Sequence, residues 1–173
     1  MTMKYITFGH HYNKDILTSK STNEDYNKFC LYKPNGLWAC PQLKPNTRQY
    51  TSEWSNFCDY NDFYTDMLEF GFTFTISHKA NILKINDPID IKPYVINPEC
   101  FNKDDMFSMF NAGKIKIDFD KIYKNFDGMY VAFSENKSIF RMSIFNSYDV
   151  SSLIVWNPNI LENIQNFKDN HIC

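Results

Sequence analysis

Apolar and polar residues alternate over several short stretches of the chain, a pattern typical of half-buried β-strands. The strictest alternation is Phe72-Thr73-Phe74-Thr75-Ile76. Other stretches are less regular, or are short apolar runs bounded by turn residues. We expect short strands at the following positions: Lys4–Phe8, Leu37–Cys40, Phe72–Ile76, Ile82–Ile85, Met129–Phe133, Met142–Phe145 and Leu153–Trp156.

Helix signals are fewer and lie between these strands. A Ser-Thr-Asn-Glu sequence predicts a helix over about Asn23–Phe29. Thr51 or Ser52 is expected to cap a second helix, and apolar spacing predicts a third over Asp118–Phe126. Because helices and strands do not alternate regularly, the sequence predicts an α+β fold with two small antiparallel sheets that meet at a cleft. We expect one domain over residues 1–173.

Composition excludes some classes of function. A net charge of −2 and the absence of a Lys/Arg run give no global basic footprint for nucleic acid. The five cysteines form no Cys-x-x-Cys pair, and the histidines lack a metal-binding spacing, so no metal is expected. No apolar run approaches the roughly 18 residues of a membrane span. We therefore expect no membrane association and a cytoplasmic protein, in the host cytoplasm if the chain is phage-encoded.

The C-terminal third carries the most specific pattern. Phe126-Asp127-Gly128 leads into one apolar strand, and a later strand runs from Ser152 into Trp156-Asn157-Pro158-Asn159-Ile160. This pattern resembles the last third of NAD-dependent ADP-ribosyltransferase domains, the superfamily of diphtheria toxin and the poly(ADP-ribose) polymerases. In that family the second strand starts with the catalytic glutamate. Here Ser152 holds the position, and Asp149, three residues earlier, is the nearest candidate acid.

A second resemblance covers much of the same sequence. Residues 118–159, together with Lys33-Pro-Asn-Gly-Leu-Trp upstream, resemble a family of small uncharacterised phage and bacterial proteins. Their shared motifs are Lys-Pro-x-Gly-Leu-Trp and an Asp-Gly followed later by Ser-x-x-x-Trp. That family has no assigned activity, so this resemblance points to no particular function.

Two upstream segments fit the ADP-ribosyltransferase pattern in order. The family's first strand ends in a histidine that hydrogen-bonds the ribose, followed by a small or polar residue and then a hydroxyl residue. His11, with Asn13 at the hydroxyl position, fits this spacing, and His10 fits if the strand ends one residue earlier. An ordinary pair of surface histidines is the alternative.

The middle segment reads Gly-Leu-Trp-Ala-Cys and then Ser-Glu-Trp-Ser-Asn-Phe-Cys. The resemblance implies an aromatic residue that stacks on nicotinamide and a serine that contacts its carboxamide. Trp38 is the first candidate aromatic residue, and Ser52 with Trp54, or Trp54 with Phe57, fits imperfectly. The alternative is that these aromatic residues belong to the core.

The resemblance implies an NAD-dependent mono-ADP-ribosyltransferase, a glycosyltransferase with NAD as substrate and a host protein or nucleic acid as acceptor, in a phage, plasmid or toxin context. Serine cannot supply the negative charge that stabilises an oxocarbenium-like state. The alternative is therefore an inactive scaffold that binds NAD, ADP-ribose or a protein partner, as an anti-defence or accessory protein. The candidate catalytic residues are His11, Trp38, Asp149 and Ser152, and the candidate NAD-binding residues are His10, Asn13, Ser52, Trp54 and Phe57.

Overall fold

The structure is a computed structural model that describes residues 3–13, 34–44, 49–96 and 115–168. Its strands are β1 (Lys4–Phe8), β2 (Leu37–Pro41), β3 (Phe70–Ile76), β4 (Ile82–Ile85), β5 (Gly128–Val131), β6 (Ser152–Val155) and β7 (Leu161–Lys168). Its α-helices are α2 (Glu53–Asn61), α4 (Phe119–Asn125) and α5 (Lys137–Arg141). Short 3-10 helices are η2 (Thr65–Glu69), η3 (Pro88–Tyr94), η6 (Phe133–Asn136) and η7 (Pro158–Ile160).

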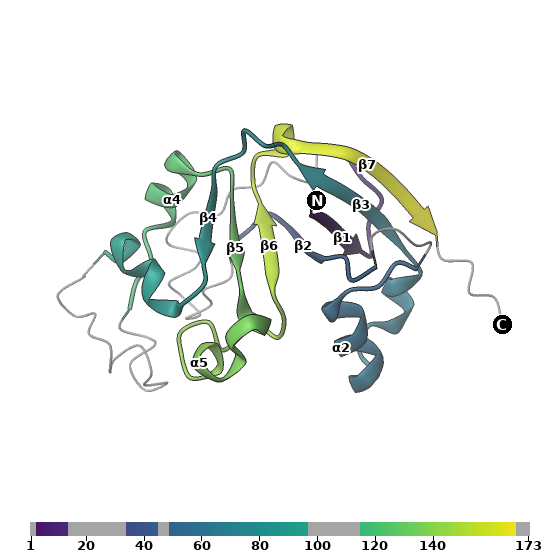
Figure 1. Ribbon diagram of the computed structural model, residues 1–173, viewed down its shortest axis with the longest axis horizontal. Helices are drawn as coiled ribbons and strands as arrows, with labels where there is room; N and C mark the ends of the chain where they lie inside the picture. Colours follow the sequence, from purple (N-terminus) through teal and green to yellow (C-terminus); the bar gives the residue numbers. More distant parts are fainter. Residues whose placement is uncertain (1–2, 14–33, 45–48, 97–114, 169–173) are drawn as a thin grey trace.

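The strands form one seven-stranded sheet in the order β4-β5-β6-β2-β1-β3-β7, which makes the fold α+β (Figure 1). Every pairing is antiparallel except that of β4 with β5. Our expectation of separate, wholly antiparallel sheets therefore needs correction. β2 joins the two halves, because it pairs with β6 along Leu37–Ala39 and with β1 only through its last residues, Cys40 and Pro41.

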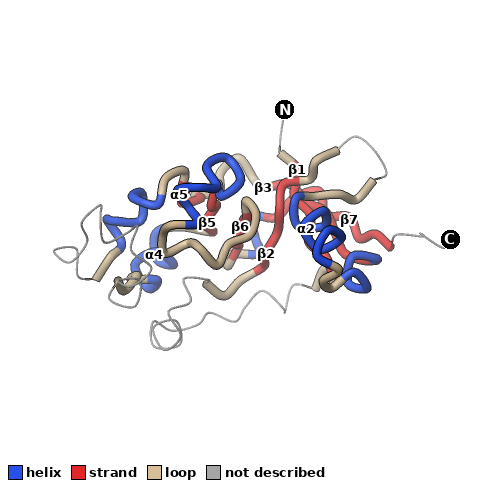
Figure 2. Tube along the Cα trace, turned by 90° about the horizontal axis from the view of Figure 1, so that it is seen from below, coloured by secondary structure: helices blue, strands red, loops and turns tan. Residues whose placement is uncertain are grey.

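Two apolar clusters follow from this arrangement. The first lies around β4, β5 and β6 and includes Ile85, Ile122 and Phe140. The second lies around β1 and β3 and includes Tyr5 and Phe74. Figures 1 and 2 place α4 and α5 with the β4–β6 half and α2 with the β1–β3 half, so each half of the sheet has its own helical cover.

One helix begins at a cap that the sequence predicts, and a second begins next to its predicted start. The Ser52 hydroxyl accepts from Ser55 N at 3.1 Å and starts α2. Asp118 accepts from Lys121 N at 3.0 Å and starts α4. The predicted helix over Asn23–Phe29 lies outside the described residues.

One predicted strand is wrong and another strand was not predicted. Met142–Phe145 forms a turn after α5, and its apolar residues Ile144 and Phe145 are buried side by side in the first cluster. β7 was missed because it is mostly polar. It is an edge strand whose buried residues are Leu161 and Phe167, so it lacks the alternation of a half-buried strand.

Candidate functional site

A cavity of about 400 Å³ opens where β1, β2 and β6 meet, and we call it the β1–β2–β6 pocket. These three strands are neighbours in the sheet. Each carries, or directly adjoins, one of the three motifs found in the sequence. Among the residues that line the pocket are five of the candidates named above: His10, Trp38, Trp54, Asp149 and Ser152.

Strand register explains how the side chains of β2 divide between its two faces. Trp38 pairs with Ile154, and Cys40 pairs with Ile6 on the other side of β2. All four residues Leu37–Cys40 line the pocket; since side chains alternate along a strand, Trp38 and Cys40 share one face of β2, and Leu37 and Ala39 pack into the second apolar cluster from the other face.

Two tryptophans form aromatic walls. The Trp38 ring lies 5.3 Å from the Tyr148 ring, and its Nε1 donates to the Pro34 carbonyl at 3.1 Å. Trp54, from the first turn of α2, stacks on Phe57 at 5.5 Å between ring centroids. Both indoles are partly buried, so each is held by protein contacts and still exposes some surface.

The floor of the pocket is buried and weakly polar. The Ser152 hydroxyl donates to the Val150 carbonyl at 3.0 Å. Burial, with a smaller contribution from the Glu53 carboxylate, raises the pKa of the Cys40 thiol to about 12, although a hydrogen bond with Ser152 acts in the opposite direction. Cys40 is therefore protonated at neutral pH and is unsuited to act as a nucleophile.

Asp149 is exposed at the rim. Of the described residues that line the pocket, Asp149 is the one with an acidic side chain. Its charge also acts on a buried thiol nearby: burial first, then Asp59 and Asp149, raise the pKa of Cys58 to about 11. Asp149 is thus close to α2 as well as to the start of β6.

Glu53 is an acid near the pocket that the sequence patterns did not indicate, and its charge acts on the pocket residue Cys40. Glu53 Oε2 accepts a hydrogen bond from the Ser134 hydroxyl and another from Ser151 N at 3.4 Å. Ser134 Oγ also accepts from Ser151 N at 3.1 Å, and Ser134 N donates to Ser151 Oγ at 2.9 Å. We call Glu53, Ser134 and Ser151 the serine clamp. It ties α2 and η6 to the residue before Ser152, and the only signal in the sequence was an acid after a helix cap.

The remaining candidates do not line the pocket. The His11 ring packs against the Phe70 ring at 5.4 Å, so His10, and not His11, shares the pocket with Trp38. Asn13 is exposed, Ser52 is the buried cap of α2, and Phe57 lies behind Trp54. Of the two histidines that the sequence left open, His10 is therefore the one at the pocket.

The Asp-Gly and Asn-Pro motifs have a structural role. Asp127 Oδ1 accepts from Asn157 Nδ2 at 2.6 Å, and its Oδ2 accepts from Asn81 N at 2.9 Å. A Cβ at Gly128 would lie 2.6 Å from the Ile154 carbonyl oxygen, so this position needs glycine. These residues join β5 to β6 at the end remote from Ser152.

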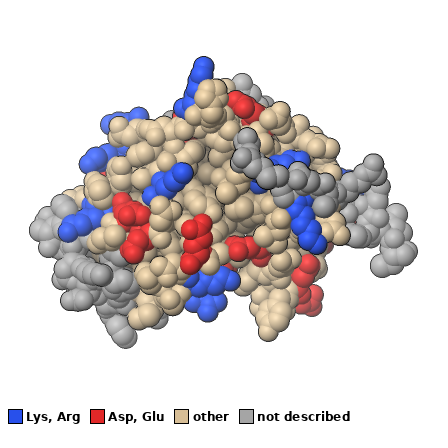
Figure 3. Space-filling model, in the orientation of Figure 1, with Lys and Arg blue, Asp and Glu red and all other residues tan. Residues whose placement is uncertain are grey.

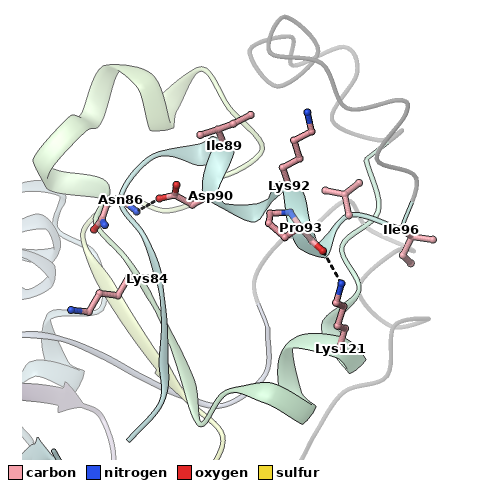
Figure 4. A pocket seen from close by; sticks show the side chains of 9 residues that line it. Lys84, Asn86, Ile89, Asp90, Lys92, Pro93, Ile96 and Lys121 are labelled. Atoms are coloured by element: carbon pink, nitrogen blue, oxygen red, sulfur yellow. Dashed lines mark hydrogen bonds between the residues drawn. The ribbon is translucent and has the colours of Figure 1, made fainter.

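A larger depression of about 940 Å³ lies over β4, η3 and α4 (Figure 4). Lys84, Lys92 and Lys121 line it, and Lys121 Nζ donates to the Pro93 carbonyl at 3.0 Å. The Asp90 carboxylate accepts from Asn86 N and Asp87 N. This depression contains none of the candidate residues from the sequence.

Within the described residues, His, Cys, Asp and Glu side chains form no cluster of three or more that could hold a metal ion. No helix in the described part of the chain has the length and apolar character needed to cross a membrane. Comparison of the chain with protein-family models, curated proteins and solved structures gives no match.

Proposed function

We propose that the protein is an NAD-dependent mono-ADP-ribosyltransferase with an ADP-ribosyltransferase-like fold, acting from the cytoplasm on a host macromolecule. One observation carries the proposal. The three motif segments lie far apart in sequence, yet their strands are neighbours and His10, Trp38 and Asp149 line one pocket. A volume of about 400 Å³ also falls within the range of small-molecule sites, about 300–1,000 Å³.

The pocket residues suit the parts of NAD that react. The indoles of Trp38 and Trp54 offer flat aromatic surfaces for the nicotinamide ring. His10 is exposed at the end of β1 and offers an imidazole to the ribose hydroxyls. Asp149 supplies negative charge at the pocket rim, where it opposes the positive charge that develops on the ribose.

In the proposed reaction the bond between nicotinamide nitrogen and ribose C1 breaks, and the bonding electrons leave with neutral nicotinamide. The acceptor's nucleophile forms the new bond to C1 and loses its proton to solvent. Asp149 stabilises the oxocarbenium-like state without forming a covalent bond. Trp38, Trp54 and His10 hold the nicotinamide riboside in place.

Nicotinamide release from NAD, measured chromatographically with and without host lysate, tests the proposal. We expect Asp149→Asn to slow release about 100-fold, the usual effect of removing one group that stabilises transition-state charge. Asp120→Asn on α4 is the matched control, because Asp120 is exposed and does not line the pocket. Absence of nicotinamide release under every condition would reject the enzymatic proposal.

A second candidate function is non-catalytic binding of NAD or ADP-ribose, and Ser152 favours it. This hydroxyl is buried and already bonded to the Val150 carbonyl, at the position where the family carries its glutamate. Calorimetric binding of NAD without nicotinamide release would support a binding module. In that case Ser152→Glu should create nicotinamide release from NAD only if the other residues of the ADP-ribosyltransferase site are correctly placed.

A further inference from the structure

The stretch from α2 to β3 has an unusual charge. Residues 49–77 contain five acids and no lysine or arginine, although the whole chain has a net charge of only −2. The acids are Glu53, Asp59, Asp62, Asp66 and Glu69. Glu53 belongs to the serine clamp, and the other four are exposed.

Large apolar side chains are exposed among these acids. The exposed fraction is 90% for Tyr60, 54% for Tyr64, 44% for Met67 and 42% for Phe63. We call these four residues, with the four exposed acids, the α2–η2 surface. Tyr64 has a left-handed backbone with φ of 52°, a conformation that is unfavourable for a bulky residue. Tyr64 adopts this unfavourable conformation in a turn that exposes its own ring and the Phe63 ring to solvent.

The α2–η2 surface continues to the pocket. The Phe63 ring contacts the Trp54 ring at 6.2 Å, edge to face, and Trp54 lines the pocket. Met67 lies 3.5 Å from the Cβ position of Gly9, next to the pocket residue His10. Figure 3 shows acidic side chains next to uncharged surface on the part of the molecule where Figure 1 draws α2.

We propose that the α2–η2 surface binds a basic protein segment, with arginine or lysine side chains over the aromatic rings and between the carboxylates. Aromatic faces attract cations, and the surrounding carboxylates add long-range attraction. The same charge repels nucleic acid phosphates. This inference rests on the proposed function in one respect: a protein segment bound here brings its nucleophile to the pocket mouth, which makes the acceptor a protein.

Fluorescence anisotropy of a labelled peptide of alternating arginine and leucine, with the full chain and no NAD, tests the binding itself. A glutamate–leucine peptide and a single-stranded oligonucleotide are the comparison probes. We expect binding of the arginine peptide alone, weakening as salt is raised. Tyr60→Ser, at the most exposed ring, should weaken it about threefold to tenfold.

The charge test is a triple variant, Asp59→Asn, Asp66→Asn and Glu69→Gln, which should weaken arginine-peptide binding by about tenfold or more. Its matched control is Asp120→Asn with Glu162→Gln, two exposed acids outside the surface. No peptide binding at about 1 mM, equal loss in the control, or tighter binding of the oligonucleotide would each overturn the proposal. The binding assay contains no NAD, so it is independent of the enzyme assay. A protein that binds the peptide but releases no nicotinamide from NAD would reject the enzymatic proposal and leave the proposal for the α2–η2 surface standing.

Discussion

Removing the Glu53 carboxylate is the sharpest test of how the start of β6 is held. Glu53 is the first residue of α2, and its Oε2 accepts from the Ser134 hydroxyl and from Ser151 N. The residue is partly buried, and the bonds connect segments 81 and 98 residues apart in the chain. Loss of the clamp therefore affects the tertiary fold and not only the helix.

The expected cost follows from these bonds. A hydrogen bond to a charged group contributes about 1.5–3 kcal/mol, and an acid in the first helical turn adds about 0.3–1 kcal/mol. Glu53→Gln keeps the shape and an acceptor oxygen but loses the charge, so we expect a loss of about 1–2 kcal/mol. Glu53→Ala also leaves Ser134 Oγ and Ser151 N without this acceptor, so about 2–4 kcal/mol is expected.

Thermal unfolding monitored by circular dichroism measures this cost. For a chain of this size about 1 kcal/mol corresponds to roughly 2–4 °C, so Glu53→Gln should lower Tm by about 4 °C. Asp59→Asn is the control on the same helix, because Asp59 is exposed and should change stability by less than about 0.5 kcal/mol. Equal Tm values for the two variants would refute the clamp.

Three further predictions use other parts of the molecule. The pKa of Cys40 is raised in the folded state, so its stabilising effect is complete below the unfolded thiol pKa of about 9 and is lost as pH rises toward 12. Alkaline unfolding curves should therefore be flatter for Cys40→Ala, and an unchanged curve would contradict this. Native Cys40 and Cys58 should both resist thiol reagents at pH 8 and react after denaturation, since both are buried; reaction in the native protein would disprove it. Gly71→Ala should cost more than about 3 kcal/mol in denaturant unfolding, because the added Cβ would lie 2.0 Å from the Thr7 carbonyl oxygen. Gly9→Ala, with φ of 80° but its nearest contact at 3.5 Å, should cost only about 1–2 kcal/mol, and the reverse order would be inconsistent with the packing.

Local patterns predicted the elements that carry a clear alternation or a helix cap. The alternation at Phe72–Ile76 became the C-terminal part of β3, and the Ser52 cap became the start of α2. The patterns failed where burial came from tertiary contacts. Polar β7 is a strand because β3 offers its edge, and Ile144 and Phe145 fill a core from a turn.

The pocket was only partly predictable for a related reason. The motifs identified Trp38, Asp149 and the start of β6, but spacing alone left His10 and His11 open. Gly9 has a φ of 80° and its N–H donates to Phe70 O, so the backbone leaves the extended conformation of β1 just before the two histidines, which spacing in the sequence could not reveal. Glu53 could not be found, because its partners Ser134 and Ser151 approach only in the folded chain.

The position of negative charge decides between the two candidate functions. Asp149 is exposed, so solvent screens its charge, and catalysis by it requires that bound NAD and acceptor displace water from the rim. Glu53 is better shielded, but its Oε2 is engaged in the serine clamp and it does not line the pocket. The two acids should therefore give different phenotypes. Asp149→Asn should lower NAD turnover without changing the free energy of unfolding, whereas the main effect of Glu53→Gln should be a lower free energy of unfolding. If nicotinamide is released and neither variant changes its rate, neither acid drives the chemistry. If neither the native protein nor the variants release nicotinamide, the binding-module function is the better account of Ser152.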